Sequence, residues 1–236
     1  MTKKRRRFYE AVTLREEEQG VCVALDGRCV KSAGGRKLVL PNRPLAQALA
    51  DEWQQQEEFV EFAQMPMMQF LSKVCDNSLP QPEEVRAEIV KYARSDLLCY
   101  RAPEPERLVK RQAENWGPVL KRLHKEEGIG FKVTSGIGWV EQEEGQIAKF
   151  ATLLHPFTGY RLGALHEITL LSGSAILAFA LARKWLSADQ LWTLCHLDED
   201  FQVEQWGADE EAQALRAQKY KAFQAAERGL ALIITV

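Results

Sequence analysis

The spacing of the apolar residues changes at Pro44, and this change constrains the fold more than any other feature of the chain. Before Pro44 the apolar runs are short. The run 21–25 (VCVAL) leads into Asp26-Gly27, and the segment 28–31 (RCVK) follows directly. Asp-Gly between two strand-like runs is a strong signal for a β-hairpin. A second glycine pair, Gly34-Gly35, marks another turn. The N-terminal part is therefore predicted to be β-rich.

After Pro44 the apolar residues follow a helical period. Leu45, Leu49 and Trp53 recur four residues apart, as on one face of an α-helix. Prolines and glycines separate further segments of the same kind, predicted as helices at 67–79, 83–92, 108–125, 162–182 and 209–231. One short strand is expected near 131–140 (FKVTSGIGWV), where it could rejoin the N-terminal sheet.

These periods predict an α+β protein with two domains. The first, residues 1–66, is a small β-rich domain with hairpins, and the second, residues 67–236, is larger and mainly α-helical. The stretch 162–182 is apolar enough to raise the question of a membrane span. His166, Glu167 and the triplet Ser172-Gly173-Ser174 favour a buried helix of a bundle instead. No membrane span is predicted.

Charge and cysteine content narrow the function classes. The net charge is −2, so the chain as a whole has no bias toward nucleic acid or anionic lipid. The basic start MTKKRRR is followed by no apolar core of a secretory signal, and we interpret it as a mobile, solvated arm, with a polyanion-binding arm as the alternative. The cysteines form no C-x-x-C pair, which favours reduced, packed thiols in a cytoplasm-like compartment.

The usual motifs for cofactors and catalysis are missing from the sequence. It contains no P-loop, no G-x-G-x-x-G and no H-E-x-x-H. His196 and Glu199 have the three-residue spacing that would place two metal ligands on one helical face, but H-x-x-E alone is a weak signal. We therefore predict no cofactor, no metal and no catalytic residue.

An acidic stretch at 191–211, LWTLCHLDEDFQVEQWGADEE, is the strongest candidate for a functional site. At about 100° per residue, a continuous helix would place Glu199 on one face between Trp192 and Trp206. Asp200 would point to water. A carboxylate within an apolar stripe needs compensation. Three alternatives follow: an internal structural pair, an aromatic and acidic face that docks a partner, or a catalytic carboxylate of an uncharacterised helical hydrolase that uses Glu199 with a His or Cys.

Several segments, in order along nearly the whole chain, resemble one family. They are RRFYEAV (6–12), LDGRCVK (25–31), LADEW (49–53), EIVKYARSDLLCYR (88–101), RQAENWGPVL (111–120), LLSGSAILAFAL (170–181) and LDEDFQVEQWGADEEA (197–212). The sequence resembles the ATP synthase assembly chaperones that attend the alpha subunit of the catalytic sector in mitochondria and alphaproteobacteria. SDLLCYR and DEDFQVEQWG are the most specific of these motifs.

The resemblance implies a non-enzymatic chaperone that binds the unassembled alpha subunit and prevents its aggregation or wrong association before it joins the beta subunit. The lack of a basic face beyond residues 3–7 and the acidic C-terminal half predict no nucleic-acid partner. With no presequence visible, we expect a bacterial cytoplasm, or the mitochondrial matrix for a processed eukaryotic form. The family's essential acid falls in the motif matched here by 198–200, and the helical wheel favours Glu199. The expected partner-binding residues are Glu199, Asp198, Asp200, Gln202 and Trp206, and Trp53 is expected to be structural.

Overall fold

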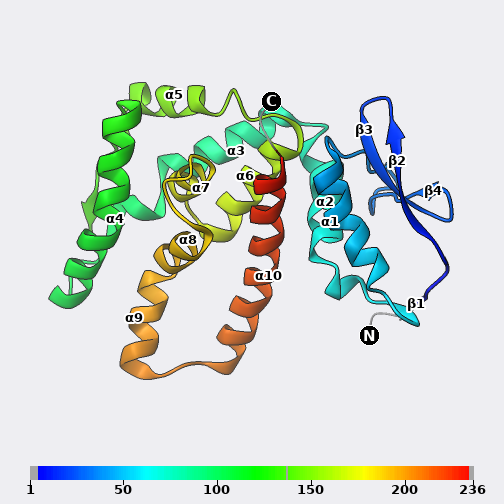
Figure 1. Cartoon of the computed structure of the whole chain (residues 1–236). Helices are drawn as coiled ribbons and strands as arrows, with labels where there is room; N and C mark the ends of the chain where they lie inside the picture. Colours follow the sequence, from blue (N-terminus) through cyan, green and yellow to red (C-terminus); the bar gives the residue numbers. More distant parts are fainter. Residues whose placement is uncertain (1–4, 137, 234–236) are drawn as a thin grey trace. The chain divides into compact units, whose positions relative to one another are not determined.

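The computed structural model describes residues 5–136 and 138–233. The chain divides into two compact units, each assembled from separate stretches of the sequence. Unit 1 consists of Met1–Pro82, Thr158–Ala164 and Tyr220–Val236. Unit 2 consists of Glu83–Phe157 and Leu165–Lys219. The α+β class predicted from the sequence is confirmed, with short strands near the N-terminus and helices over most of the remainder (Figure 1).

The strands and helices of the described chain have the following bounds. The strands are β1 Arg5–Arg6, β2 Val12–Glu17, β3 Gly20–Leu25, β4 Arg28–Cys29, β5 Phe59–Val60, β6 Tyr100–Arg101 and β7 Thr134–Ser135. The helices are α1 Arg43–Gln54, α2 Pro66–Lys73, α3 Pro82–Arg94, α4 Glu106–Glu127, α5 Glu144–Leu153, α6 Gly159–Ser172, α7 Ala175–Ala182, α8 Ala188–Cys195, α9 Leu197–Trp206 and α10 Glu210–Leu232. Short 3-10 turns cover Phe62–Gln64 and Leu97–Cys99, and a π-helical turn covers Val74–Ser78.

Unit 1 is built on the predicted hairpin. Strands β2, β3 and β4 form an antiparallel sheet in that order, and α1 packs against β2 and β3 (Figure 1). Asp26 and Gly27 have φ angles of 46° and 79°, the left-handed values that a tight hairpin turn requires. Helix α1 starts where the period changes, because the Asn42 side chain accepts a hydrogen bond from the Leu45 N–H.

The basic N-terminal segment is part of unit 1 from Arg5 onward, so the interpretation as a mobile arm is wrong for Arg5, Arg6 and Arg7. Strand β1 pairs with β5. The Arg7 guanidinium donates to the backbone carbonyls of Gln56, Tyr9 and Glu10. Backbone carbonyls thus replace the water expected around this charge. Lys3 and Lys4, which belong to the same predicted arm, lie outside the described residues.

Two of the cysteines form a disulfide, which corrects the expectation that all of them are reduced thiols. Cys22 and Cys29 are joined across β3 and β4, with a Cα–Cα distance of 5.9 Å. Because Ala24 is the register partner of Cys29, Cys22 is its diagonal neighbour on the same face of the hairpin. A seven-residue separation matches no cysteine motif, so only the register brings the two together. Cys75, Cys99 and Cys195 are free.

The core of unit 2 is aromatic. Trp116, Phe150 and Phe179 are fully buried, and the Trp116 indole N–H donates to the Leu194 carbonyl at 2.9 Å. Asp96, also fully buried, accepts hydrogen bonds from the Ser174 hydroxyl (2.7 Å), the Ile176 N–H (3.0 Å) and the Leu98 N–H (3.1 Å). One carboxylate therefore holds the start of α7 to the turn that follows α3.

The apolar stretch 162–182 is two helices and not one. Helix α6 ends at Ser172, Gly173 adopts a φ of 69°, and the Ser174 side chain caps α7 through the Leu177 N–H. Ser174 and the buried Asp96 stabilise this break, because they satisfy the first N–H groups of α7. Within the described residues, no helix combines the length and the apolar character that crossing a membrane requires.

The two units differ from the division at residue 66 that we expected. Helix α2, after that residue, belongs to unit 1 and contacts α1, and the end of α10 belongs to unit 1 as well. The short strand within 131–140 is β7, and it pairs in parallel with β6 of unit 2 instead of joining the N-terminal sheet. Tyr100 is opposite Thr134 in that pair.

Gly229 of α10 lies where no larger residue fits. A Cβ atom at this position would be 2.4 Å from Cε1 of Phe70, a buried residue of α2. We expect Gly229→Ala to lower the free energy of unfolding by about 1–3 kcal/mol, since α10 and α2 would be forced apart. Urea denaturation measures this. Gly145→Ala in α5 is the control, because its Cβ would meet nothing within 4 Å. Equal stability of the two variants would contradict the close approach.

Candidate functional site

The predicted acidic face is divided by a helix break at His196. His196 has φ −109° and ψ 14°, which ends α8 and precedes α9. The wheel assumed one continuous helix, so it does not fix where Trp192 of α8 lies relative to Glu199. Within α9, Glu199 and Trp206 keep the helical spacing that the wheel used. Asp198, Glu199 and Asp200 instead form the first turn of α9, where carboxylates interact favourably with the helix dipole.

Asp198 makes an internal contact. Its carboxylate accepts a hydrogen bond from the Gln112 side-chain amide at 2.8 Å. The side-chain oxygen of Gln112 accepts a hydrogen bond from the Ala102 N–H at 2.9 Å. The Arg101 guanidinium donates to the backbone carbonyl of Gln112 at 2.6 Å. Asp198 therefore fastens the start of α9 to α4. Asp198 was predicted to bind the partner, but in the structure its carboxylate makes this contact with another residue of unit 2.

Asp200 also makes an internal contact, which corrects the expectation that it points to water. Its carboxylate pairs with the Arg216 guanidinium of α10, and both side chains are half-buried. This hydrogen bond raises the pKa of Arg216 above its usual value. Farther along α9, Glu204 pairs with Arg111 of α4 at 2.6 Å. These pairs fix the orientation of α9 on both sides.

Glu199 is not held in this way. Its side chain is 64% exposed, and its nearest basic neighbour is His196, with Nε2 at 3.9 Å from the carboxylate. Burial lowers the pKa of His196, so the imidazole is neutral near pH 7 and does not offset the charge of Glu199. Glu199 thus presents a negative charge to solvent, and Arg216 interacts with that charge only through space.

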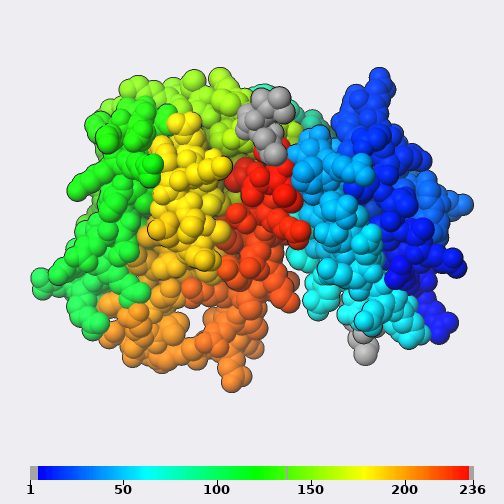
Figure 2. All heavy atoms as spheres, viewed as in Figure 1, coloured from blue at the N-terminus to red at the C-terminus, as the bar shows by residue number. Residues whose placement is uncertain are grey.

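Apolar side chains are exposed at the end of the same helix. Trp206 is 80% exposed, and Val203 is exposed as well; Leu215, on α10, is another exposed large apolar residue. Gln202, which lies between Glu199 and Val203 in the sequence, is also exposed. We call Glu199, Gln202, Val203 and Trp206 the α9 surface. The orange segment in Figures 1 and 2 carries it, at the surface of the molecule. Tryptophan is enriched among the residues that contribute most to binding at protein interfaces.

The geometry near Glu199 does not fit covalent catalysis. Cys195 Sγ lies 3.1 Å from His196 Nδ1, but that nitrogen also lies 2.9 Å from the Trp192 carbonyl. A carbonyl only accepts, so Nδ1 carries the proton and cannot remove one from the thiol. Burial, with the nearby charge of Glu199, raises the pKa of Cys195 to about 12, so the thiol stays protonated.

Ligand-type side chains also meet in unit 1. Among the described residues, Glu17, Cys22 and Cys29 have potential ligand atoms within 4.8 Å of one another. The disulfide occupies both sulfurs, and the Glu17 carboxylate pairs with Arg15 and Lys37. The residues present therefore favour a structural crosslink over a metal centre. The spacing of His196 and Glu199 suggested a metal site in the sequence. Among the described residues, these two are not part of a group of three potential ligands.

Comparison with known proteins places the chain in a family. The profile of the ATP12 chaperone proteins matches residues 6–124. The mitochondrial protein atp12 of Schizosaccharomyces pombe is 23% identical over 219 residues, which cover 88% of this chain and 75% of that protein.

Solved structures resemble the whole chain. A crystal structure from Agrobacterium tumefaciens is 40% identical, with a TM-score of 0.92, and the match covers 97% of this chain and 86% of that one. Atp12 from Paracoccus denitrificans is 35% identical, with a TM-score of 0.91 and coverage of 98% and 99%. An Asp-to-Lys mutant of the Paracoccus protein matches at 35% identity and a TM-score of 0.90.

The profile covers just over half of the sequence, and the structural matches extend the likeness to nearly all of it. The resemblance drawn from the SDLLCYR and DEDFQVEQWG motifs is thereby confirmed. The chain belongs to the ATP12 chaperone protein family, the assembly chaperones of the ATP synthase.

Proposed function

We propose that this protein binds the unassembled alpha subunit of the ATP synthase catalytic sector through the α9 surface. The observation that carries the proposal is the contrast among the acids of α9. Asp198, Asp200 and Glu204 have internal partners, whereas Glu199 is exposed and faces a neutral histidine. A rigidly held helix with one largely exposed carboxylate and an exposed Trp206 is preorganised for a basic and apolar client surface.

Asp198 and Asp200 contribute to this function by positioning. Each is part of a contact that anchors α9, so the exposed face keeps one geometry before the client arrives. Trp206 and Gln202 would contact the client directly. Binding would hold the alpha subunit out of wrong association until the beta subunit replaces the chaperone.

The proposed action is binding and not catalysis. The protonated Cys195 thiol disfavours a hydrolase that uses Glu199 with the cysteine, and the 3.9 Å between His196 Nε2 and the Glu199 carboxylate, too long for a hydrogen bond, disfavours one that uses the histidine. A compartment that holds unassembled alpha subunits is required, and we propose the bacterial cytoplasm, with the mitochondrial matrix as its equivalent for eukaryotic relatives.

Glu199→Lys tests the proposal. We expect the variant to fold and to lose protection of the isolated alpha subunit against aggregation, because the reversed charge repels the client cation. Close charge pairs at interfaces couple by about 1.5–7 kcal/mol, enough to abolish protection at equimolar concentration. Light scattering of the alpha subunit with each variant measures protection, and circular dichroism melts report folding.

Two further variants serve as controls. Glu126→Lys reverses an exposed charge on α4, away from the α9 surface, and should protect like wild type. Asp200→Lys should lower the melting temperature, because it opposes Arg216 with a second cation. If Glu199→Lys protects the alpha subunit as well as wild type does, the α9 surface is not the client site.

A further inference from the structure

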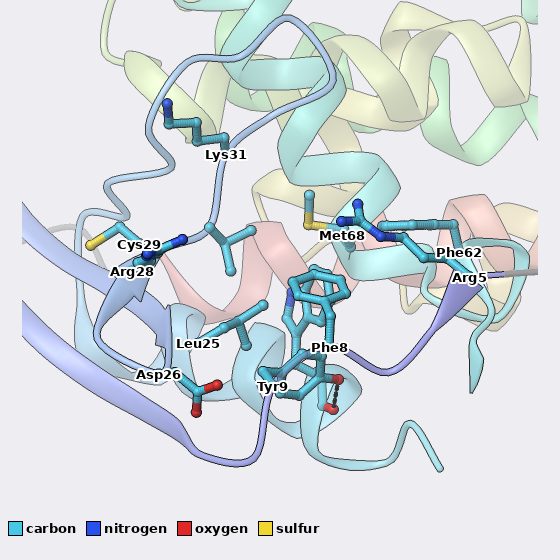
Figure 3. A pocket seen from close by; sticks show the side chains of 12 residues that line it. Arg5, Phe8, Tyr9, Leu25, Asp26, Arg28, Cys29, Lys31, Phe62 and Met68 are labelled. Carbon is cyan, nitrogen blue, oxygen red and sulfur yellow. Dashed lines mark hydrogen bonds between the residues drawn. The ribbon is translucent and has the colours of Figure 1, made fainter. Parts of the chain in front are cut away.

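Unit 1 contains a cavity that the proposed α9 surface does not involve. It has a volume of about 520 Å³ and lies among the hairpin, α1, α2 and the N-terminal segment. Figure 3 shows Phe8, Phe62 and Met68 on its apolar side and Arg5, Arg28 and Lys31 around it. Phe8 is 49% and Phe62 is 46% exposed, so two large aromatic rings line the opening without being covered.

An unsatisfied donor lines the cavity. Trp53 is 3% exposed, and its indole N–H has no hydrogen-bond partner among the described residues. The ring is fixed by edge-to-face contacts with Tyr9 and Phe62, at centroid distances of 5.5 and 5.9 Å. A buried donor without an acceptor is costly, and in a native protein it calls for an explanation. The indole nitrogen is itself buried, so an acceptor supplied by a ligand in the cavity would reach it only if the Phe8 or Phe62 ring shifted.

The charges around the cavity are predominantly positive. Arg28 and Lys31 have no ion-pair partner within the described part of the chain, and Arg5 lies over the Phe8 ring at 4.3 Å. The one acid of the lining, Asp26, already accepts hydrogen bonds from the backbone N–H groups of Glu10 and Ala11. An occupant with carboxylates beside an apolar group would therefore match this lining in charge.

The cavity continues into a second one. A neighbouring cavity of about 710 Å³ shares Lys31, Phe62 and Met68 with the first and extends toward Ser72 and Asn77. Two adjoining cavities of this size are larger than one side chain needs, and they suit several residues of an extended chain. We call the two together the unit 1 groove.

We propose that the unit 1 groove is a second docking site, for an extended peptide segment with an apolar side chain flanked by carboxylates. The apolar side chain would lie between Phe8 and Phe62 and displace one of these rings, so that a carbonyl or carboxylate oxygen could accept from the Trp53 indole. Arg28 and Lys31 would pair with the flanking acids. This inference rests on the proposed function in one respect only: the peptide segment would come from the client, the unassembled alpha subunit.

Binding of a synthetic peptide to the full chain tests this without the alpha subunit. The probe is acetyl-Gly-Glu-Glu-Phe-Leu-Asp-Gly-amide. Two matched peptides carry Lys in place of the acids, or Ser in place of Phe and Leu. Indole N–H signals in ¹H–¹⁵N spectra report the contact, and Trp53→Phe identifies the signal of Trp53. We expect the acidic peptide to shift that signal downfield in a saturable manner, and the two matched peptides to leave it unchanged.

Charge reversal in the groove gives a second measure. Lys31→Glu should raise the Kd of the acidic peptide about five- to tenfold at low salt, as expected for a partly exposed ion pair converted to a repulsion. Lys91→Glu on α3 is the matched control and should leave the Kd unchanged. An unmoved Trp53 signal, equal shifts with the lysine peptide, or equal effects of the two reversals would overturn the proposal. The aggregation assay with Glu199→Lys is independent of these results, so either proposal can fail alone.

Discussion

Asp96→Ala should unfold unit 2 at temperatures where the wild-type protein is stable. The substitution leaves the Ser174 hydroxyl and the N–H groups of Ile176 and Leu98 without their acceptor, in a site that water does not reach. Loss of a buried charged acceptor costs about 3–5 kcal/mol, which is a large part of the stability of a typical domain. Thermal melts followed by near-ultraviolet circular dichroism measure the loss.

The dependence of the unfolding free energy on pH distinguishes the contribution of the Asp96 charge from the contribution of its hydrogen bonds. Burial raises the pKa of Asp96 from 3.8 to about 6, against the hydrogen bonds that favour the anion. A raised carboxyl pKa means that the folded state prefers the proton. The stability from this group is therefore present below pH 3.8 and lost as the pH rises to about 6.

Asp96→Asn is the matched control for this dependence, because it keeps the shape but cannot titrate. The difference in unfolding free energy between wild type and Asp96→Asn should shrink as the pH rises from 4 to 6.5, by up to about 3 kcal/mol. A difference that stays constant over this range would show that Asp96 does not titrate with a raised pKa. Asp96→Ala should be the least stable of the three at every pH.

Trp53→Arg should leave unit 1 unfolded and the protein largely insoluble. Trp53 is packed against Phe8, Tyr9 and Phe62. A guanidinium in its place would be a buried charge next to the cations Arg28 and Lys31, and the one acid of the lining, Asp26, already accepts from backbone N–H groups. An unpaired buried charge and the lost ring together cost about 4 kcal/mol or more. Expression yield in the soluble fraction and urea denaturation measure the effect.

Trp53→Phe is the matched control, since it keeps an aromatic ring and removes the indole N–H. We expect it to stay folded, with a loss of unfolding free energy of about 1–2 kcal/mol from the smaller ring. If Trp53→Arg instead melts like wild type and only fails to bind its client, Trp53 is a recognition residue and its structural assignment is wrong.

Local signals in the sequence predicted much of the fold. The Asp26-Gly27 hairpin, the start of α1 after Asn42 and the final helix α10 all follow from period and turn chemistry within a few residues. The burial of Trp53 follows from the same apolar period. Family motifs predicted the chaperone function, because seven segments in order are far more specific than any one of them.

Features that depend on distant contacts were not predictable. The break at His196 has no proline or glycine to announce it, and it places Trp192 and Glu199 on different helices. Asp198 and Asp200 accept hydrogen bonds from Gln112 and Arg216, which lie on other helices. Because the sequence does not show these contacts, both acids were predicted to bind the partner. The Cys22–Cys29 disulfide and the unit 1 groove likewise arise only when the hairpin, α1 and α2 come together.

The interrupted layout of unit 1 has a consequence for how the protein is made. Ribosomes release the N-terminus first, but unit 1 also needs Gly229 against Phe70 and the Leu232 carbonyl that accepts from the Asn42 amide. Unit 2 is complete in sequence at Lys219, before these residues are translated. At about 5–20 residues per second the delay is short, yet the hairpin domain that is translated first is the last to receive all its parts.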